Sequence, residues 1–145
     1  MVSVKEVARE VSVLVPKLMM SMKSERFLKN SVTTHQQMIT IMQINTIGPC
    51  KISKVADKMG VSAPTMTGLI DRLQRMEYVE RFRDKKDRRI IFVKVTRKGA
   101  KLVQQLKEII QRRWEVILGY LTVGERTAYA NILRKIISAL SKHEN

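Results

Sequence analysis

The feature that most limits how this chain can fold is a tight turn between two short helical segments near its middle. The stretch "SKVADKMG" predicts a short helix, with Ser53 as its N-cap and Gly60 as a left-handed C-cap. The next stretch, "VSAPTMTGLIDRLQRM", predicts a second helix that Ser62 caps, with Pro64 in its first turn, where a missing N–H is harmless. The two helices therefore meet across Gly60 and Val61.

This spacing matches the steric needs of a helix-turn-helix. That motif needs a small residue where the helices cross, a glycine at the turn, and apolar residues on the inner side of the second helix. Ala56, Gly60 and Met66 meet these needs in order, with Val55 and Leu69 as apolar neighbours. Other helical hairpins can share the spacing, so the pattern alone is only moderately specific.

Helices also flank this pair on both sides. Apolar residues recur every three or four positions from Val4 to Met22, with Pro16 expected to kink or break the helix. The stretch "TTHQ" predicts a capping box from Thr33 to Gln36 at the start of a helix that ends near Gly48. Two more apolar-periodic helices follow Thr96, with a break predicted at residues 122–124.

A β-hairpin is predicted directly after the second helix of the pair. "VERFR" and "RRIIFVKV" flank a polar "DKKD", and in the second stretch Ile91, Val93 and Val95 alternate with Phe92 and Lys94. A hairpin that served only for packing would have no use for the basic residues at its tip, Lys85, Lys86, Arg88 and Arg89. The order predicts a mainly α fold with one small β-hairpin wing, which is the arrangement of a winged helix-turn-helix.

The charge of the chain points to a polyanionic partner. Its 145 residues include 28 Lys and Arg against 13 Asp and Glu, a net charge of +15. Residues 51–101 carry fifteen basic and six acidic groups, a net of +9 within about a third of the chain. A basic wing tip can reach DNA phosphates or enter the minor groove, where negative potential attracts arginine. Nucleic acid is therefore the partner expected of this segment.

Several other classes of protein fit the sequence poorly. One Cys and two His are too few for an all-Cys/His zinc site, and no phosphate-binding loop, nucleophile motif or carboxylate cluster is present. We therefore expect no metal, no cofactor and no catalysis. The N-terminal stretch is interrupted by charges and Pro16, so it fits neither a signal peptide nor a membrane span, and a cytoplasmic location is expected.

The stretch "LIDRLQRMEYVERFRDKKDRRIIFVKVTRKG" resembles the recognition helix and wing of the MarR family of transcriptional regulators. The family pattern runs Leu-Val-x-Arg, an Asp-x-Arg wing tip, and Leu-Thr-x-x-Gly. Its positions correspond here to Val79, Arg81, Asp87, Arg89, Val95, Thr96 and Gly99. Two positions depart from it: Glu77 stands where the family usually has glycine, and Val95 where it has leucine. A less favourable C-cap, or a slightly different exit angle from the helix, is expected at Glu77.

The resemblance implies roles for individual residues. Arg89 would enter the minor groove, Asp87 would hold it by an ion pair, and Lys85, Lys86 and Arg88 would lie near phosphates; a plain surface salt bridge is the alternative. On the second helix the candidate DNA contacts are Ser62, Ala63, Pro64, Thr65, Thr67, Gly68 and Arg72. Only Arg72 among these could make a bidentate guanine contact, although Asp71 could pair with it instead.

The resemblance also implies that the single domain, residues 1–145, has separate regions for DNA binding and dimerisation. Residues 31–99 would form the winged helix-turn-helix, and residues 1–30 and 100–145 the N- and C-terminal dimerisation helices of a homodimer. Such a dimer would bind a pseudo-palindromic site on double-stranded DNA. The nine methionines fit core packing better than the pocket for small phenolic effectors that the family often has, and Cys50 and His35 fit structural roles.

Together these features predict a ligand-responsive repressor that binds its operator as a homodimer. Two alternatives share the same fold: an architectural protein that coats DNA or RNA without sequence choice, and a winged helix used only for protein assembly. The net charge of residues 51–101 argues against the last.

Overall fold

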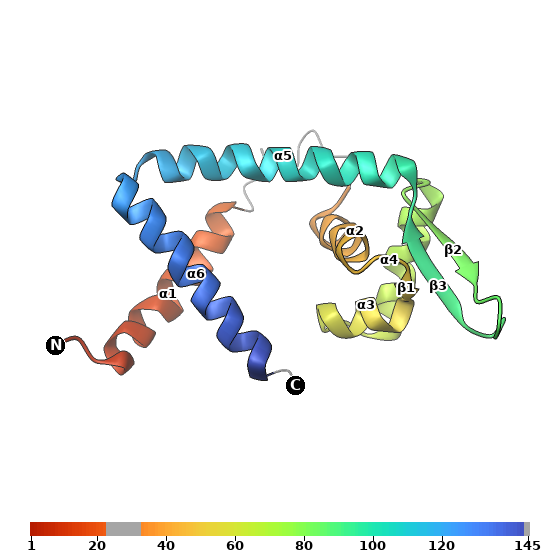
Figure 1. Ribbon diagram of the computed structural model, residues 1–145, viewed down its shortest axis with the longest axis horizontal. Coiled ribbons are helices and arrows are strands. Elements are labelled where there is room, and N and C mark those ends of the chain that lie inside the picture. The colour runs from red at the N-terminus through yellow and green to blue at the C-terminus, as the bar shows by residue number, and fades with distance from the viewer. Residues whose placement is uncertain (23–32, 144–145) are drawn as a thin grey trace. The chain divides into compact units, whose positions relative to one another are not determined.

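The computed structural model describes residues 1–22 and 33–143 and confirms the mainly α class with a small antiparallel sheet (Figure 1). The chain forms two compact units, Met1–Val103 and Gln104–Asn145. The helices are α1 (Val4–Met22), α2 (His35–Ile47), α3 (Ile52–Met59), α4 (Ala63–Arg75), α5 (Arg97–Gly119) and α6 (Val123–His143). The strands are β1 (Cys50–Lys51), β2 (Val79–Arg83) and β3 (Ile91–Val95). The predicted boundary between residues 30 and 31 lies outside the described residues.

The core of the first unit joins α2, α3, α4 and the sheet. Its fully buried side chains include Ile41, Ile44, Val55, Met66, Ile70, Leu73, Val79 and Val93. Ala56, at the predicted crossing of α3 and α4, is also buried. Burial at residues 66, 69, 70 and 73 follows the helical period, so one side of α4 faces the core and the other faces solvent.

The sheet has three strands rather than the predicted two. The hairpin pairs β2 with β3 from Val79 opposite Val95 to Arg83 opposite Ile91, as the alternation predicted. The third strand, β1, adds Cys50 opposite Val93 on the other side of β3. Sequence periodicity could not reveal β1, because two residues are too few to show an alternation.

Two predicted helix starts were wrong. The capping box of α2 lies one residue later, since Thr34 Oγ1 accepts from Gln37 N at 3.3 Å and Gln37 Oε1 accepts from Thr34 N at 3.0 Å. Thr33 is instead buried. Helix α3 begins before Ser53, with Lys51 as an N-cap that makes no side-chain hydrogen bond, because β1 already holds the backbone there.

Of the two effects predicted for Pro16, a kink or a break, the break does not occur. Helix α1 continues through Pro16 as one element of 19 residues. Proline removes one backbone donor from a helix, and that loss did not end this one.

The second unit contains the later part of α5 and all of α6. Thr122 Oγ1 accepts from Glu125 N at 3.3 Å, and Glu125 Oε2 accepts from Thr122 N at 2.8 Å, which forms a capping box for α6. The break therefore comes just before Val123, and Gly124 lies inside α6. Within this unit, the rings of Trp114 and Tyr129 lie 5.9 Å apart.

The end of α4 is fastened to the start of α5 through three successive backbone carbonyls. The carbonyl oxygen of Met76 accepts from Lys98 Nζ at 3.0 Å, that of Glu77 from Thr96 Oγ1 at 2.6 Å, and that of Tyr78 from Thr96 N at 3.1 Å. Thr96 Oγ1 also accepts from Gly99 N at 3.0 Å, which confirms it as the cap of α5. We call this set of contacts the α4–α5 joint.

Glu77 has the left-handed backbone conformation inside this joint, with φ of 63°. It is the one non-glycine residue with positive φ in the described part of the chain. Glycine, which the family usually has at this position, adopts this conformation freely, whereas Glu77 adopts it at the energetic disadvantage of a Cβ. Lys98 Nζ lies 3.7 Å from the Glu77 carboxylate and 5.1 Å from the centre of the Tyr78 ring.

Gly99 is required by the close approach of two backbones in the joint. A Cβ at Gly99 would collide with the carbonyl oxygen of Tyr78 and would lie 2.8 Å from Val95 Cγ1. The oxygen belongs to the backbone and is held by Thr96, so it cannot move aside easily. The Thr-x-x-Gly pattern thus has a physical basis in this chain: Thr96 holds the turn by hydrogen bonds, and Gly99 leaves room for the Tyr78 carbonyl.

We expect Glu77→Gly to raise the free energy of unfolding by about 1 kcal/mol, because glycine adopts positive φ without the Cβ penalty. Denaturant unfolding at fixed protein concentration measures this change. Glu77→Ala is the matched control, since it removes the carboxylate and keeps the Cβ. An equal gain in both variants would show that the carboxylate, and not the backbone, is unfavourable.

We expect Gly99→Ala to lower the free energy of unfolding by about 2 kcal/mol or more, because the added methyl group overlaps backbone atoms. Gly124→Ala is the matched control: nothing lies within 4 Å of its Cβ position, so alanine there should be neutral or stabilising. Thermal and denaturant unfolding of both variants provide the measurement. A Gly99→Ala variant as stable as the wild type would contradict the packing of the joint.

Candidate nucleic-acid interface

The turn between α3 and α4 has the geometry expected of a helix-turn-helix. Gly60 is left-handed, with φ of 62° and ψ of 33°, and its N–H donates to the carbonyls at the end of α3. Val61 N donates to the Ala56 carbonyl at 3.1 Å, which closes the turn. Ser62 Oγ accepts from Thr65 N at 3.3 Å, and Pro64 lies in the first turn of α4. All three sequence-based expectations for this turn are confirmed.

The candidate contact residues of α4 lie on its solvent side. The exposed members are Ser62, Ala63, Pro64, Thr65, Thr67 and Arg72, and Gly68 is half-buried. The hydroxyls of Ser62 and Thr65 lie 2.8 Å apart and bond to each other at the start of the helix. The exposed face therefore begins with small and hydroxyl-bearing side chains, which can approach another molecule closely.

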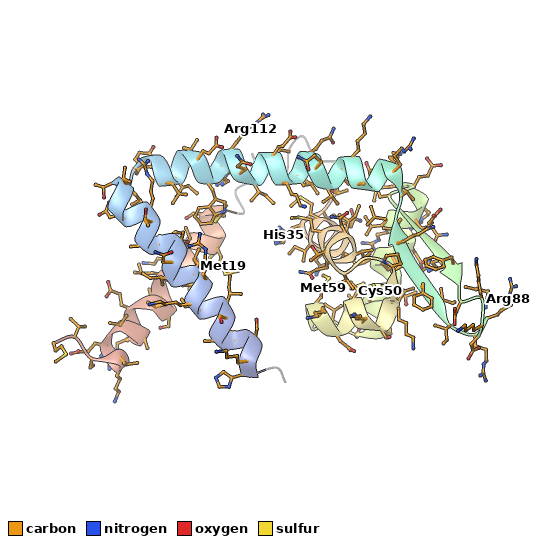
Figure 2. All side chains as sticks on the ribbon, in the orientation of Figure 1. Met19, His35, Cys50, Met59, Arg88 and Arg112 are labelled. Carbon is orange, nitrogen blue, oxygen red and sulfur yellow. The ribbon has the colours of Figure 1, made fainter. Side chains whose placement is uncertain are left out.

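The wing tip between β2 and β3 is an ordered turn. Asp84 N donates to the Ile90 carbonyl at 3.0 Å, and Ile90 N donates to the Asp87 carbonyl at 3.0 Å. Asp84 Oδ2 also accepts from Asp87 N at 3.3 Å. These bonds present Lys85, Lys86, Arg88 and Arg89 outward, all exposed, and Figure 2 shows Arg88 at the outer end of the hairpin.

Arg89 and Asp87 form a two-point ion pair at this tip. Arg89 Nε donates to Asp87 Oδ1 and its NH2 group donates to Oδ2, both at 3.0 Å. Arg89 N donates to Oδ1 as well, at 3.1 Å. These hydrogen bonds lower the pKa of the Asp87 carboxyl group, so it is ionised at neutral pH. The Arg89 side chain is 91% exposed, so the pair orients the guanidinium without covering it.

Aromatic stacking braces the face of the wing that carries Phe82 and Phe92, a contact that the sequence alone did not reveal. The rings of Phe82 and Phe92 are stacked with their centres 5.5 Å apart, across the β2–β3 pair. Lys94 Nζ lies 5.2 Å from the centre of the Phe82 ring and 3.2 Å from the Glu80 carboxylate. The strand register places these residues opposite one another, so it could have predicted the pairs once the hairpin was assumed.

The sequence suggested that Asp71 could pair with its neighbour Arg72, but the structure does not show this pair. Its Oδ1 atom instead accepts from the Arg81 NH2 group at 2.6 Å, which joins α4 to β2. Neighbouring residues of a helix point in different directions, so Arg72 was the less favourable partner. Arg72 is exposed on the solvent side of α4.

The other singled-out residues have modest settings. Cys50 is buried in β1, and burial raises the pKa of its thiol, which disfavours the reactive thiolate. His35 is exposed in the first turn of α2. Met38 and Met66 are core residues as expected, whereas Met19 and Met20 are exposed on α1.

The described residues form neither a metal site nor a membrane-spanning helix. Across residues 1–22 and 33–143, His, Cys, Asp and Glu side chains do not gather in a group that could hold a metal ion. Among the helices that the structure describes, none is long and apolar enough to cross a membrane.

Comparisons with known proteins agree with this geometry. The transcriptional repressor NicR of Pseudomonas putida is 30% identical over 106 residues, 73% of this chain and 67% of NicR. The regulator YfiV of Bacillus subtilis is 39% identical over 72 residues, 50% of this chain and 45% of YfiV, so the chain matches less than half the length of that relative.

Solved structures share the fold at lower identity. A MarR family protein from Bacillus stearothermophilus superposes with a TM-score of 0.86 at 21% identity, covering 97% of this chain and 99% of the other. FabT of Streptococcus pneumoniae, solved in complex with DNA, superposes with a TM-score of 0.74 at 20% identity and the same coverage. The model of the MarR family matches residues 33–91, from just before α2 to the first residue of β3. This chain belongs to the MarR family of winged helix-turn-helix transcriptional regulators.

Proposed function

We propose that this chain is a sequence-specific DNA-binding transcriptional regulator, with residues 31–99 as its DNA-binding region. The observation that carries the proposal is the wing tip, where Asp87 holds an exposed Arg89 guanidinium in a fixed direction. An arginine presented on a narrow ribbon suits the minor groove, whose negative potential varies with sequence. In this proposal Lys85, Lys86 and Arg88 contact neighbouring phosphates.

Helix α4 enters the major groove in the same proposal. Its solvent side carries Ser62, Ala63, Pro64, Thr65, Thr67, Gly68 and Arg72. Small side chains let the helix backbone approach the bases, and the threonine methyl groups can touch thymine. With only Arg72 suited to a bidentate guanine contact, sequence choice would depend on several weak contacts and on DNA shape.

The active species in this proposal is a homodimer formed by residues 1–30 and 100–145. In the single chain, neither α1 nor α6 has a buried residue. Both helices nevertheless repeat large apolar residues at helical spacing, among them Val7, Val11, Leu14 and Leu18 in α1 and Ile132, Ile136 and Leu140 in α6. Such faces are typical of surfaces that a second subunit covers. A two-fold dimer in turn predicts an inverted-repeat site.

The sign of regulation and the effector follow from family likeness. NicR is named a repressor, and the family resemblance implies release by a small molecule such as a phenol. We therefore propose a cytoplasmic repressor that a small ligand dissociates from DNA. An architectural protein that coats DNA uniformly is the rival, since a net charge of +9 in residues 51–101 would also suit that function.

Footprinting on the DNA upstream of its own gene should show a protected inverted repeat, with half-sites about one helical turn apart. Arg89→Ala should weaken binding to that DNA at fixed salt by on the order of 1 kcal/mol or more, measured by titration. Arg112→Ala is the matched control, because it removes the same charge from an exposed position on α5. Uniform protection would favour the architectural rival, and an unchanged Arg89→Ala affinity would exclude the wing assignment.

Light scattering at micromolar concentration should give twice the chain mass of 16.8 kDa. The pair Ile136→Glu and Leu140→Glu should shift the mass to that of one chain, because it puts two charges on the apolar face of α6. Ser138→Glu adds a charge elsewhere on the same helix and should leave the dimer intact. A wild-type protein with the mass of one chain would refute the dimer.

A further inference from the structure

Arg81 connects the wing to helix α4 through two short hydrogen bonds. Its NH2 group donates to Asp71 Oδ1 and its NH1 group donates to Gln74 Oε1, both at 2.6 Å. Asp71 and Gln74 lie about one turn apart on the same side of α4, so the planar guanidinium bridges two successive turns of the helix. The Arg81 side chain is only 23% exposed, which strengthens these bonds relative to a fully solvated pair.

Because Arg81 lies in the middle of β2, these bonds hold the middle of the wing against α4. Alternate residues of a strand share a face, so Val79, Arg81 and Arg83 lie on the same face of β2. Val79 is buried in the core at the root of the wing, and Arg83 NH1 donates to the Arg88 carbonyl at 2.7 Å near the tip. Along one face, the wing is thus held at its root, in its middle and at its tip.

A two-stranded ribbon needs such support in order to hold a direction. Isolated hairpins are marginally stable, and β1 pairs with β3 alone, at Phe92 and Val93, so β2 on the other side of the hairpin gains no support from β1. Asp71 and Gln74 belong to the same helix as the candidate contact residues Thr67 and Arg72. Arg81 therefore ties the helix and the wing to each other between the core and the tip.

We propose that Arg81 is a positioning residue for DNA binding, which fixes the wing against α4 so that both reach the DNA in one geometry. This inference rests on the proposed DNA-contacting roles of α4 and the wing. Arg81 also neutralises Asp71, whose carboxylate is half-exposed on α4 and would otherwise repel phosphates. Protein acceptors already engage both terminal nitrogens of the Arg81 guanidinium, and the side chain is largely covered, so its role in this proposal is to position the wing and not to contact the DNA.

A double-mutant cycle between Arg81 and Arg89 tests the proposal. The two side chains have separate partners, so their effects on affinity should simply add unless Arg81 sets the position of the wing. The probe is a duplex of about 30 base pairs that the wild-type protein selects from a randomised library, long enough for two half-sites. Affinities of the single and double Ala variants are measured at several salt concentrations.

We expect Arg81→Ala to weaken binding to the selected duplex by about tenfold. The loss of affinity caused by Arg89→Ala should be at least about threefold smaller in the Arg81→Ala protein than in the wild type. The salt dependence should stay unchanged in Arg81→Ala, whereas a lost phosphate contact would reduce its slope by about one. Arg81→Lys should remain defective, because an ammonium group cannot span Asp71 and Gln74 as the guanidinium does.

The outcomes separate this inference from the proposed function. Additive losses from Arg81→Ala and Arg89→Ala, or rescue by Arg81→Lys together with a reduced salt slope in Arg81→Ala, would overturn the positioning role and leave the wing contact standing. If Arg89→Ala alone leaves the affinity for the duplex unchanged, both the wing contact and the positioning role of Arg81 are overturned. Thermal unfolding shows whether each variant is folded. If Arg81→Ala is not, Gln74→Ala takes its place: it removes only one of the two acceptors of Arg81, so it should give a smaller loss of affinity that is likewise non-additive with Arg89→Ala.

Discussion

The α4–α5 joint fixes the geometry on which the candidate interface depends. The last carbonyls of a helix lack partners within it, and here those of Met76 and Glu77, followed by that of Tyr78, are satisfied by side chains and backbone from the start of α5. The absence of a side chain at Gly99 lets the two backbones meet. The exit direction of β2, and with it the direction of the wing, follows from this contact.

Electrostatic pairing along the wing explains how so basic a surface keeps a defined shape. Asp71 pairs with Arg81, Asp87 with Arg89, and Glu80 with Lys94, so three acidic residues of this region each hold one basic partner. Exposed pairs contribute little stability individually, and their effect here is orientation. Positive charge beyond these pairs, including Lys85, Lys86 and Arg88 at the tip, is available for a polyanion.

Sequence reasoning succeeded where local chemistry decides structure. Gly60 and Ser62 define the turn through backbone conformation and capping, and the alternation from Ile91 to Val95 defines the strand. It misplaced the cap of α2 by one residue, because Thr33 and Thr34 are chemically equivalent candidates and only burial distinguishes them. It missed β1 because two residues paired across the sheet leave no periodic signal.

The candidate site divides in the same way. The sequence by itself determined which residues are charged, which are small, and that a basic ribbon follows a helix-turn-helix, because these properties depend on residue type and spacing. Tertiary structure alone decided that Asp71 bonds to Arg81 and not to Arg72, and that Glu77 occupies a left-handed turn. Both results depend on how β2 leaves α4, a direction that is set by contacts between residues about twenty positions apart, from Met76 to Lys98.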